Sequence, residues 1–318
     1  MNDHHAPVWR EWRGAMAGQR RHHAWLLAGK RGLGKSEFAL AAAHEMVTGG
    51  DAAQPDPLHH PDIHYLTHAP ADSKEAAKQA DGKPFKVKRN IAVEQIRGVQ
   101  ARLTTRPTLG DRRAIIVDPA DDLEKGAANA LLKSLEEPPV GTFFLLVAHR
   151  PGRLLPTIRS RCRVLRFAPL DPETITQQLR AAHPDRDAAT LEAAAAASAG
   201  SPGRAEEFLA LDLAPLHRLM REIARNGDAD FTRRGALAAA MGPRPDRERQ
   251  LAAIDLARAA VAELARDAVP ARLPAIADAY AELDQLAGQA PTYNFDPGLL
   301  IMQIGTLLTR AASDRQPA

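Results

Sequence analysis

A glycine-rich stretch near the amino terminus constrains the fold of this chain more than any other feature. Residues 29–36 read GKRGLGKS, which matches the pattern G-x-x-x-x-G-K-[ST] at every fixed position. An apolar run from Ala24 to Ala28 precedes it and predicts a buried strand, and the residues from Ser36 to Val47 have helical spacing. This order of strand, glycine turn and helix predicts a phosphate-binding loop in a parallel α/β domain.

Each part of the loop has a chemical reason. Glycine allows tight turns, so successive backbone N–H groups can point toward phosphate oxygens, and the helix N-terminus adds a favourable dipole. The Lys35 ammonium would reach the β- and γ-phosphates, and the Ser36 hydroxyl would hold Mg²⁺. ATP and Mg²⁺ are therefore the expected ligands, with a loop of the same shape that binds no nucleotide as the alternative. The candidate nucleotide-binding residues of the loop are Gly29, Lys30, Arg31, Gly32, Leu33, Gly34, Lys35 and Ser36.

An NTPase also needs carboxylates outside the loop, one to hold the metal and one to polarise the attacking water. The apolar run from Arg113 to Val117 predicts a second buried strand, and Asp118 at its end is the candidate for the metal. Pro119 follows, so no second acid is adjacent. Asp121 and Asp122 lie a few positions further on, where a solvated loop or a helix N-cap is the alternative interpretation. The sequence predicts nucleotide binding with weak or no hydrolysis by this chain alone.

Other short apolar runs alternate with helical spacing through the first half of the chain. The expected strands are residues 63–66, 142–148 and 164–167, and the expected helices are residues 91–103 and 127–135. By composition, residues 48–61 predict a loop and residues 67–88 a mobile polar surface loop. Strands that alternate with helices predict a parallel sheet covered on both faces.

The pattern changes after Pro169. No convincing strand follows, and prolines divide the remaining sequence into helices. The predicted architecture is an α/β domain with a nucleotide-binding-like P-loop in residues 1–169, a small helical lid domain in residues 170–210 and a larger helical domain in residues 211–318.

Composition narrows the class of protein. With 45% hydrophobic and 25% charged residues, the 318-residue chain is typical of soluble globular proteins, and its net charge of +3 permits nucleic-acid contact without requiring it. The single cysteine, Cys162, excludes an internal disulfide and a Cys-rich zinc site, and we expect a small buried residue there rather than a catalytic thiol. Without a signal core or a run of about 18 apolar residues, a cytoplasmic protein with no membrane association is expected.

Four segments carry a combined pattern: HHAWLLAG at residues 22–29, AANALLKSLEEPP at 127–139, TIRSRC at 157–162 and GSPG at 200–203. Together they resemble the AAA+ clamp-loader subunits of bacterial DNA polymerase III. The NALLKSLEEPP run and the SRC tripeptide are highly specific in combination, and the resemblance covers residues 20–210. It implies an AAA+ fold for the first domain and an oligomerisation collar for the last.

Two subunit types of this family are alternatives. The motor type (gamma/tau) has an Asp-Glu pair after its second strand and a four-cysteine zinc module, whereas here Pro119 follows Asp118 and residues 48–62 lack cysteine. The delta-prime type tolerates a degraded ATP site, and the motor's sensor arginine position falls on Gly203, with Arg204 one residue displaced. The resemblance favours the delta-prime type without zinc. An active ATPase motor is the alternative, and a stand-alone P-loop kinase for a small metabolite is a third interpretation.

Arg161, in the SRC tripeptide, is the residue to which the resemblance assigns a catalytic role. A guanidinium offers a rigid fork of donors and a permanent charge. In the family it acts across a subunit boundary as an arginine finger, where it stabilises charge on the γ-phosphate bound by a neighbouring motor subunit. From the residues alone, a helix cap or a pairing with a local carboxylate is the alternative.

The resemblance also implies partners. A delta-prime subunit belongs to a hetero-oligomer with the gamma/tau motor subunits and the delta subunit, which acts on the sliding clamp and primed DNA. The chain would help to load the clamp, with its own contact to the clamp only indirect. It would then be a component of the DNA-directed DNA polymerase III holoenzyme, a nucleotidyltransferase, with no independent catalysis of its own.

Two further groups of residues have weaker patterns. Imidazole and carboxylate are zinc ligands, but the histidines and aspartate between residues 56 and 68 have no fixed ligand spacing, so no metal is expected. These residues are His59, His60, Asp62, His64 and His68. A basic group would make salt-dependent phosphate contacts if it faces DNA, and a solvated loop is the alternative. Its members are Lys83, Lys86, Lys88, Arg89, Arg97, Arg102 and Arg106.

Overall fold

The computed structural model describes residues 5–18, 22–51, 53–290 and 295–312. The chain forms two compact units, Met1–Pro169 and Leu170–Ala318. The first unit ends at Pro169, which is also the last residue of the predicted α/β domain. The predicted division of the second half at residues 210–211 stays a prediction.

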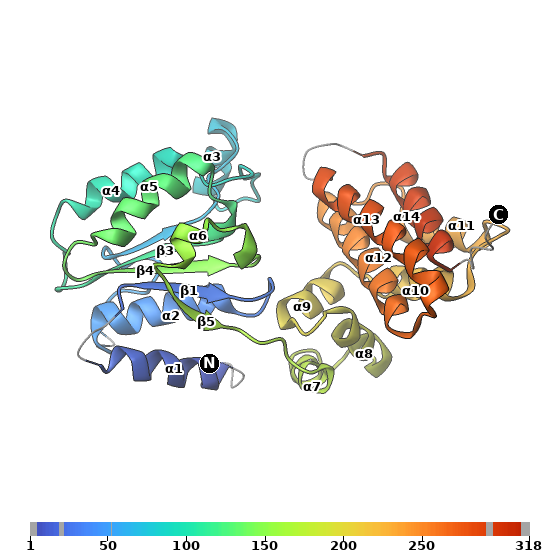
Figure 1. Ribbon diagram of the computed structural model, residues 1–318, viewed down its shortest axis with the longest axis horizontal. Helices are drawn as coiled ribbons and strands as arrows, with labels where there is room; N and C mark the ends of the chain where they lie inside the picture. The colour runs from blue at the N-terminus through green and yellow to red at the C-terminus, as the bar shows by residue number, and fades with distance from the viewer. Residues whose placement is uncertain (1–4, 19–21, 52, 291–294, 313–318) are drawn as a thin grey trace. The chain divides into compact units, whose positions relative to one another are not determined.

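A parallel sheet forms the centre of the first unit (Figure 1). Its strands are β1 (Ala24–Ala28), β2 (Ile63–Leu66), β3 (Arg113–Val117), β4 (Thr142–Ala148) and β5 (Arg163–Arg166). Their order is β2-β3-β4-β1-β5, and every pairing is parallel. Strands β1, β3 and β4 are buried at every residue because they lie in the middle of the sheet with helices over both faces. The predicted α/β class is confirmed.

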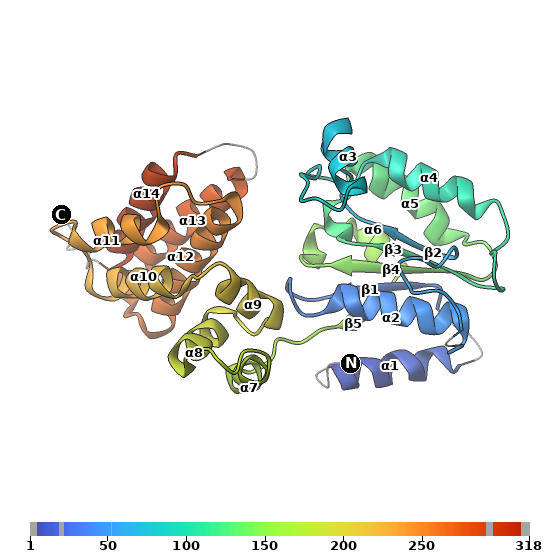
Figure 2. The same cartoon turned by 180° about the vertical axis from the view of Figure 1, so that it is seen from behind.

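Helices cover the two faces of the sheet separately, as Figures 1 and 2 show. The helices of this unit are α1 (Ala6–Met16), α2 (Lys35–Thr48), α3 (Ser73–Ala80), α4 (Val93–Leu103), α5 (Lys125–Glu136) and α6 (Pro156–Arg159), with 3₁₀ turns η2 (Ala120–Asp122) and η3 (Pro151–Arg153). Side chains alternate along a strand. Leu26 therefore packs in the cluster with Ile96 and Leu131, and Leu27 packs in the opposite cluster with Phe38.

The N-terminal helix α1 belongs to the core of the first unit. Its apolar stripe buries Trp9 and Trp12, which are 5% and 1% exposed. The ring centroid of Trp9 lies 4.4 Å from that of Phe38 on α2, and the centroid of Trp12 lies 4.8 Å from that of Trp25 on β1. Aromatic contacts of this kind bury large apolar areas, so they fix α1 against the helix that follows the glycine loop.

The expected mobile loop at residues 67–88 is wrong in part, because it contains α3. Asp72 caps this helix by accepting the N–H groups of Lys74 and Glu75 at 2.8 and 2.9 Å. Glu75 then accepts the N–H of Lys86 at 2.7 Å and ties the returning chain to the helix. These contacts could not be predicted from the lysine-rich composition of the segment.

Polar contacts hold the segment at residues 48–62, which has no cysteine. His44 on α2 donates from Nε2 to the carbonyl oxygen of Pro55 at 3.0 Å. His60 donates from Nε2 to Oε1 of Gln54 at 3.2 Å. The His44 side chain therefore connects this loop to α2, and the His60 side chain forms a hydrogen bond within the loop.

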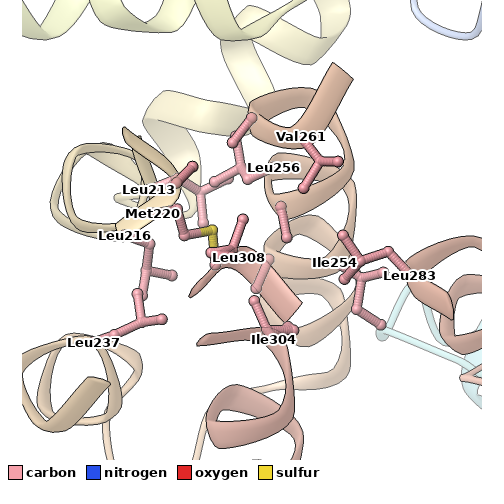
Figure 3. Packing of buried hydrophobic residues seen from close by; sticks show 14 of the residues in the cluster. Leu213, Leu216, Met220, Leu237, Ile254, Leu256, Val261, Leu283, Ile304 and Leu308 are labelled. Atoms are coloured by element: carbon pink, nitrogen blue, oxygen red, sulfur yellow. The ribbon is translucent and has the colours of Figure 1, made fainter. Parts of the chain in front are cut away.

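The described residues of the second unit form helices joined by turns and loops, without a strand. Its helices are α7 (Pro172–Ala182), α8 (Ala188–Ala197), α9 (Pro202–Ala210), α10 (Ala214–Asn226), α11 (Thr232–Met241), α12 (Arg247–Asp267), α13 (Leu273–Gln289) and α14 (Pro297–Ala312), with a 3₁₀ turn η4 (Pro270–Arg272). One apolar cluster runs through it from Ile175 to Ala311. Figure 3 shows part of this cluster, where Met220, Leu256 and Leu308 come from three different helices.

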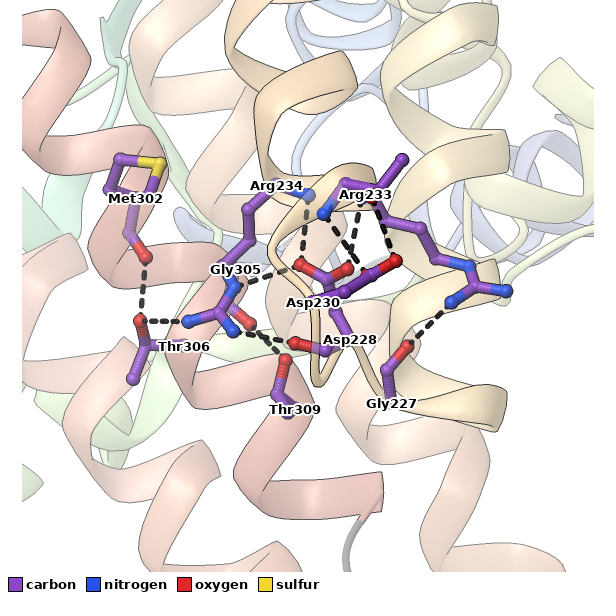
Figure 4. Close-up of polar contacts among 10 residues, drawn as sticks. Gly227, Asp228, Asp230, Arg233, Arg234, Met302, Gly305, Thr306 and Thr309 are labelled. Atoms are coloured by element: carbon purple, nitrogen blue, oxygen red, sulfur yellow. Dashed lines mark hydrogen bonds and ion pairs between the residues drawn. The ribbon is translucent and has the colours of Figure 1, made fainter.

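A buried ion pair lies within the helical unit (Figure 4). Arg234 on α11 donates from Nε to Oδ2 of Asp228 at 2.8 Å and from Nη2 to the carbonyl oxygen of Asp228 at 2.6 Å. The two residues are 7% and 1% exposed. The arginine crosses Gly305 on α14, where a Cβ atom would lie 2.5 Å from the Cγ of Arg234. Glycine is required at that crossing.

Across the described residues, none of the helices is both long enough and apolar enough to cross a membrane.

Candidate nucleotide-binding site

The glycine loop connects the carboxyl end of β1 with the amino end of α2. Gly29 donates its N–H to the carbonyl oxygen of Ala148 at 3.2 Å, which fixes the start of the loop to β4. A Cβ atom at Gly29 would lie 2.6 Å from the carbonyl oxygen of Phe167, so no larger residue fits there. Gly32 and Gly34 have φ of 79° and 71°, the left-handed region that favours glycine. The backbone therefore adopts the turns that the sequence motif predicts.

Lys35 turns its ammonium back into the loop. Its Nζ donates to the carbonyl oxygens of Gly29 at 2.7 Å and Lys30 at 2.5 Å. The residue is 2% exposed, and burial lowers the pKa of its ammonium to about 8, while the charges of Asp118 and Asp121 oppose the shift. A buried cation bound mainly by neutral carbonyl groups is a favourable site for an anion.

The metal candidate Asp118 is bound by the phenol of Tyr65, which donates to Oδ2 of Asp118 at 2.7 Å. Burial and the adjacent carboxylate raise the pKa of the Tyr65 phenol well above its ordinary value, and the side chain of the other metal candidate, Ser36, acts against this rise. Asp118 is itself only 6% exposed, and its N–H donates to the carbonyl oxygen of Leu66 at 2.9 Å.

Sequence reasoning missed Tyr65. The available signal was its position, one residue before the end of a short strand. In the structure that strand pairs with β3, and Asp118 follows the last residue of β3. Tyr65 lies opposite Ile116, and Leu66 lies opposite Val117. Because the carboxyl ends of parallel strands meet at one sheet edge, a polar residue there is a site candidate.

The two later carboxylates bind groups within the chain. Asp121 accepts the N–H groups of His149 and Arg150 at 3.0 and 2.9 Å, which fixes the turn after β4. Asp122 lies 3.2 Å from Nε2 of His68, and that hydrogen bond lowers the pKa of the carboxyl group. Asp121 therefore lies in a turn and accepts backbone donors, an arrangement close to the capping alternative.

His149 is a second residue that sequence reasoning missed. It follows the last residue of β4, and its Nδ1 is buried with no hydrogen-bond partner among the described residues. Burial lowers the pKa of the imidazole, as do the positive charges of Lys35 and Arg31, while Asp121 acts against the shift. A neutral imidazole beside Lys35 can donate to or accept from a phosphate-bound group.

His5 is a third missed residue, from the segment before the first strand. Its Nε2 lies 2.8 Å from the carbonyl oxygen of Leu33 and donates to it, because the carbonyl can only accept. The ring also fills the space beside Gly34, where a Cβ atom would lie 2.5 Å from Cε1 of His5. The N-terminal segment thus holds the glycine loop from outside.

Arg161 lies between α6 and β5. Its Nη1 donates to the carbonyl oxygen of Thr157 at 2.9 Å, and its Nη2 forms an ion pair with Glu136. The side chain is 34% exposed. The guanidinium therefore lies at the surface and binds a local carboxylate, the alternative that the residues alone left open. Cys162 beside it is buried, and burial raises the pKa of its thiol to about 12, so it is not activated as a nucleophile.

Side chains of the histidine-rich loop contact other groups of the chain. Both oxygens of Asp62 accept backbone N–H groups, from Thr108 at 2.6 Å and Leu109 at 2.8 Å. Nδ1 of His64 lies 3.4 Å from Nη1 of Arg102. No group of three or more His, Cys, Asp or Glu side chains suited to a metal ion occurs in the described ranges.

The predicted basic group is spread over the loop after α3, over α4 and over the segment after α4, where Arg106 lies. Within it, Lys83 forms an ion pair with Asp81 at 2.9 Å. A contact of this group with DNA stays a prediction. In the second unit, Arg204 pairs with Asp255 at 2.5 Å, so this displaced arginine is bound within its own unit.

Comparisons with known proteins cover mainly the first unit. The family model described as "DNA polymerase III, delta subunit" matches residues 4–171. The chain is 35% identical over 203 residues to a DNA polymerase III subunit delta' of Pseudomonas aeruginosa, covering 61% of this chain and 58% of that protein. It is 44% identical over 124 residues to the subunit delta' of Escherichia coli, covering 38% and 36%. It is also 30% identical over 166 residues to a tau/gamma subunit of Haemophilus influenzae, covering 50% of this chain and 22% of that protein. The matches thus span less than two thirds of these relatives.

Proposed function

The chain belongs to the DNA polymerase III delta subunit family, and on that premise we propose that it is a delta-prime subunit of a bacterial clamp loader. In this role it helps a hetero-oligomer of gamma/tau motor subunits and delta to place the sliding clamp on primed DNA in the cytoplasm. The motor-type relative also matches, but over only 22% of its length.

One observation carries the choice of a non-catalytic subunit. The phosphate loop has the backbone of a nucleotide site, but Pro119 follows Asp118, and the next acids, Asp121 and Asp122, bind His149, Arg150 and His68. A phosphoryl-transfer site needs a group that orients the attacking water. The chain therefore binds ATP without hydrolysing it at a useful rate, and the chemistry of the complex belongs to its neighbours. Ser36 and Asp118 stand at the positions that would hold Mg²⁺, whose positive charge would offset that of the phosphates, but in this chain the Tyr65 phenol donates to Asp118 at 2.7 Å.

In this proposal Arg161 contributes its guanidinium to the ATP site of the neighbouring motor subunit. A surface guanidinium that binds one carboxylate can exchange it for the γ-phosphate presented by an adjacent subunit, and Glu136 orients the fork until then. The rigid planar fork suits a phosphate better than a lysine ammonium does. The resulting contribution is electrostatic stabilisation of charge in the transition state.

A reconstituted complex tests this role. Motor subunits, delta and this chain are assembled, and ATPase activity is measured with clamp and primed DNA. Arg161→Ala is expected to leave assembly intact and to lower turnover at the completed site on the order of 10³-fold, as for other trans arginines.

Arg159→Ala is the matched control, because Arg159 is exposed and lies two residues away. It should keep full activity. Unchanged ATPase in the Arg161→Ala complex would contradict the finger. Equilibrium ATP binding by the isolated chain, with Lys35→Ala as the comparison, tests the nucleotide site, and brisk turnover by the isolated chain would instead favour the motor type.

A further inference from the structure

Tyr65 contacts the carboxylate that a P-loop site would use for a divalent cation. A phenol carries one hydrogen and two lone pairs. Here the hydroxyl donates its hydrogen to Asp118, with the phenol oxygen 2.7 Å from Oδ2. A carboxylate at this position is the group that holds Mg²⁺ in a P-loop site. The phenol therefore already satisfies the acid on which a cation would depend.

We propose that Tyr65 closes the metal position, so that this chain binds a nucleoside triphosphate without a tightly held divalent cation. The inference rests on the nucleotide binding proposed above, and it names the residue that sets the metal dependence of that site.

The position of the phenol is set by the sheet. Tyr65 lies in β2, paired with Ile116 of β3, and its partly buried ring packs against the cluster under α2. The N–H of Asp118 donates to the carbonyl oxygen of Leu66, which is the residue after Tyr65. Backbone hydrogen bonds of the sheet thus fix the positions of both the Tyr65 phenol and the Asp118 carboxylate. Because Tyr65 lies on a strand, its hydrogen bond does not depend on the conformation of a loop.

A cation would have to replace these contacts. Mg²⁺ demands near-octahedral oxygen ligands at about 2.0–2.1 Å and gives up its water reluctantly. At Asp118 it would displace a hydrogen bond to a charged acceptor, which is stronger than a bond between neutral groups. The carboxylate is only 6% exposed, so water compensates poorly for the lost contact.

The remainder of the phosphate cradle does not depend on a cation. Gly32 and Gly34 keep the left-handed turns that expose backbone N–H groups, and the Lys35 ammonium supplies positive charge. His149 adds a buried nitrogen whose pKa the charge of that ammonium helps to lower. These groups recognise phosphate oxygens directly.

The test compares ATP affinity with excess Mg²⁺ and with EDTA, by calorimetry on the full chain. For the wild type we expect the two affinities to agree within about twofold. Tyr65→Phe removes only the hydroxyl, and its affinity should rise about tenfold with Mg²⁺, which corresponds to one hydrogen bond to a charged group. Tyr280→Phe, in the second unit, is the matched control and should behave as the wild type.

A second readout is the electron paramagnetic resonance spectrum of Mn²⁺ titrated with ATP and each variant. Tyr65→Phe should immobilise Mn²⁺, and Asp118→Asn added to it should abolish the gain. A wild-type chain that gains as much from Mg²⁺ as Tyr65→Phe overturns the inference, as does a Tyr65→Phe variant that binds no ATP in either condition. Neither result touches the Arg161 test, which depends on the neighbouring subunit's site, so the two proposals fail separately.

Discussion

Two buried cations, one in each unit, are held in opposite ways. In the glycine loop, Lys35 donates to two neutral carbonyl oxygens, and burial lowers its pKa to about 8. In the helical unit, Arg234 binds the carboxylate and the carbonyl of Asp228 (Figure 4). Its guanidinium lies 3.7 Å from the ring centroid of Phe231. The charge of the arginine is neutralised inside the fold, while that of the lysine is compensated only from further away.

This difference separates a structural cation from one that awaits a ligand. A buried ion is stable when a partner with good geometry satisfies it, and it is costly when none does. Arg234 is therefore part of the scaffold that packs α11 against α14. Lys35 holds a charge at some expense of stability, and a phosphate would relieve it.

The largest expected effect comes from breaking the structural pair. Asp228→Ala leaves a buried guanidinium without its carboxylate, so we expect a loss of about 3–5 kcal/mol in the free energy of unfolding of the helical unit. Urea denaturation followed by circular dichroism measures it. Asp230→Ala is the control, because Asp230 is exposed and its hydrogen bonds within the described part of the chain go to Thr232, so its cost should be below about 1 kcal/mol. Equal costs for the two variants would contradict the assignment of Arg234 to the scaffold.

The pH dependence of stability sharpens the description of Lys35. Between its folded pKa of about 8 and its ordinary value of 10.5, the unfolded chain holds a proton that the folded chain has lost. Stability therefore rises with pH in that window. We expect a gain of at most about 2 kcal/mol from this group between pH 7.5 and 9.5.

The measurement for Lys35 is urea unfolding at both pH values in the wild type and in Lys35→Met. The variant lacks the titrating group, so the pH-dependent gain should shrink by that amount. A wild type and a variant with the same pH dependence would show that the ammonium is not strained by burial.

The smallest effect is expected at the surface pair Arg161 and Glu136. Their side chains are 34% and 47% exposed, and exposed ion pairs contribute little. Arg161→Ala or Glu136→Gln should change the unfolding free energy by less than about 1 kcal/mol. A loss comparable with that of Asp228→Ala would make this arginine a scaffold residue and would argue against its role in a neighbouring site.

Prediction from sequence succeeded where a local pattern carries the whole signal. The strands at 24–28, 63–66, 113–117 and 142–148 occur at those residues, because short apolar runs have few other folded solutions. It failed at α3, where the cap at Asp72 and the contact of Glu75 with Lys86 outweigh a polar composition. The helix predicted at residues 127–135 spans Lys125–Glu136 in the structure. Its ends differ because the first and last residues of a helix depend on weak local contacts.

The glycine loop, its lysine and serine, and the absence of an acid after Asp118 were determined by the sequence alone, because they are relations between neighbouring residues. Tertiary structure decided which distant side chains meet them. Only parallel pairing of β2 with β3 brings Tyr65 to Asp118, and only the packing of α1 brings His5 to Leu33, 28 positions away. The physical reason is that hydrogen bonds select partners by position in space, and the sheet and its helices set those positions.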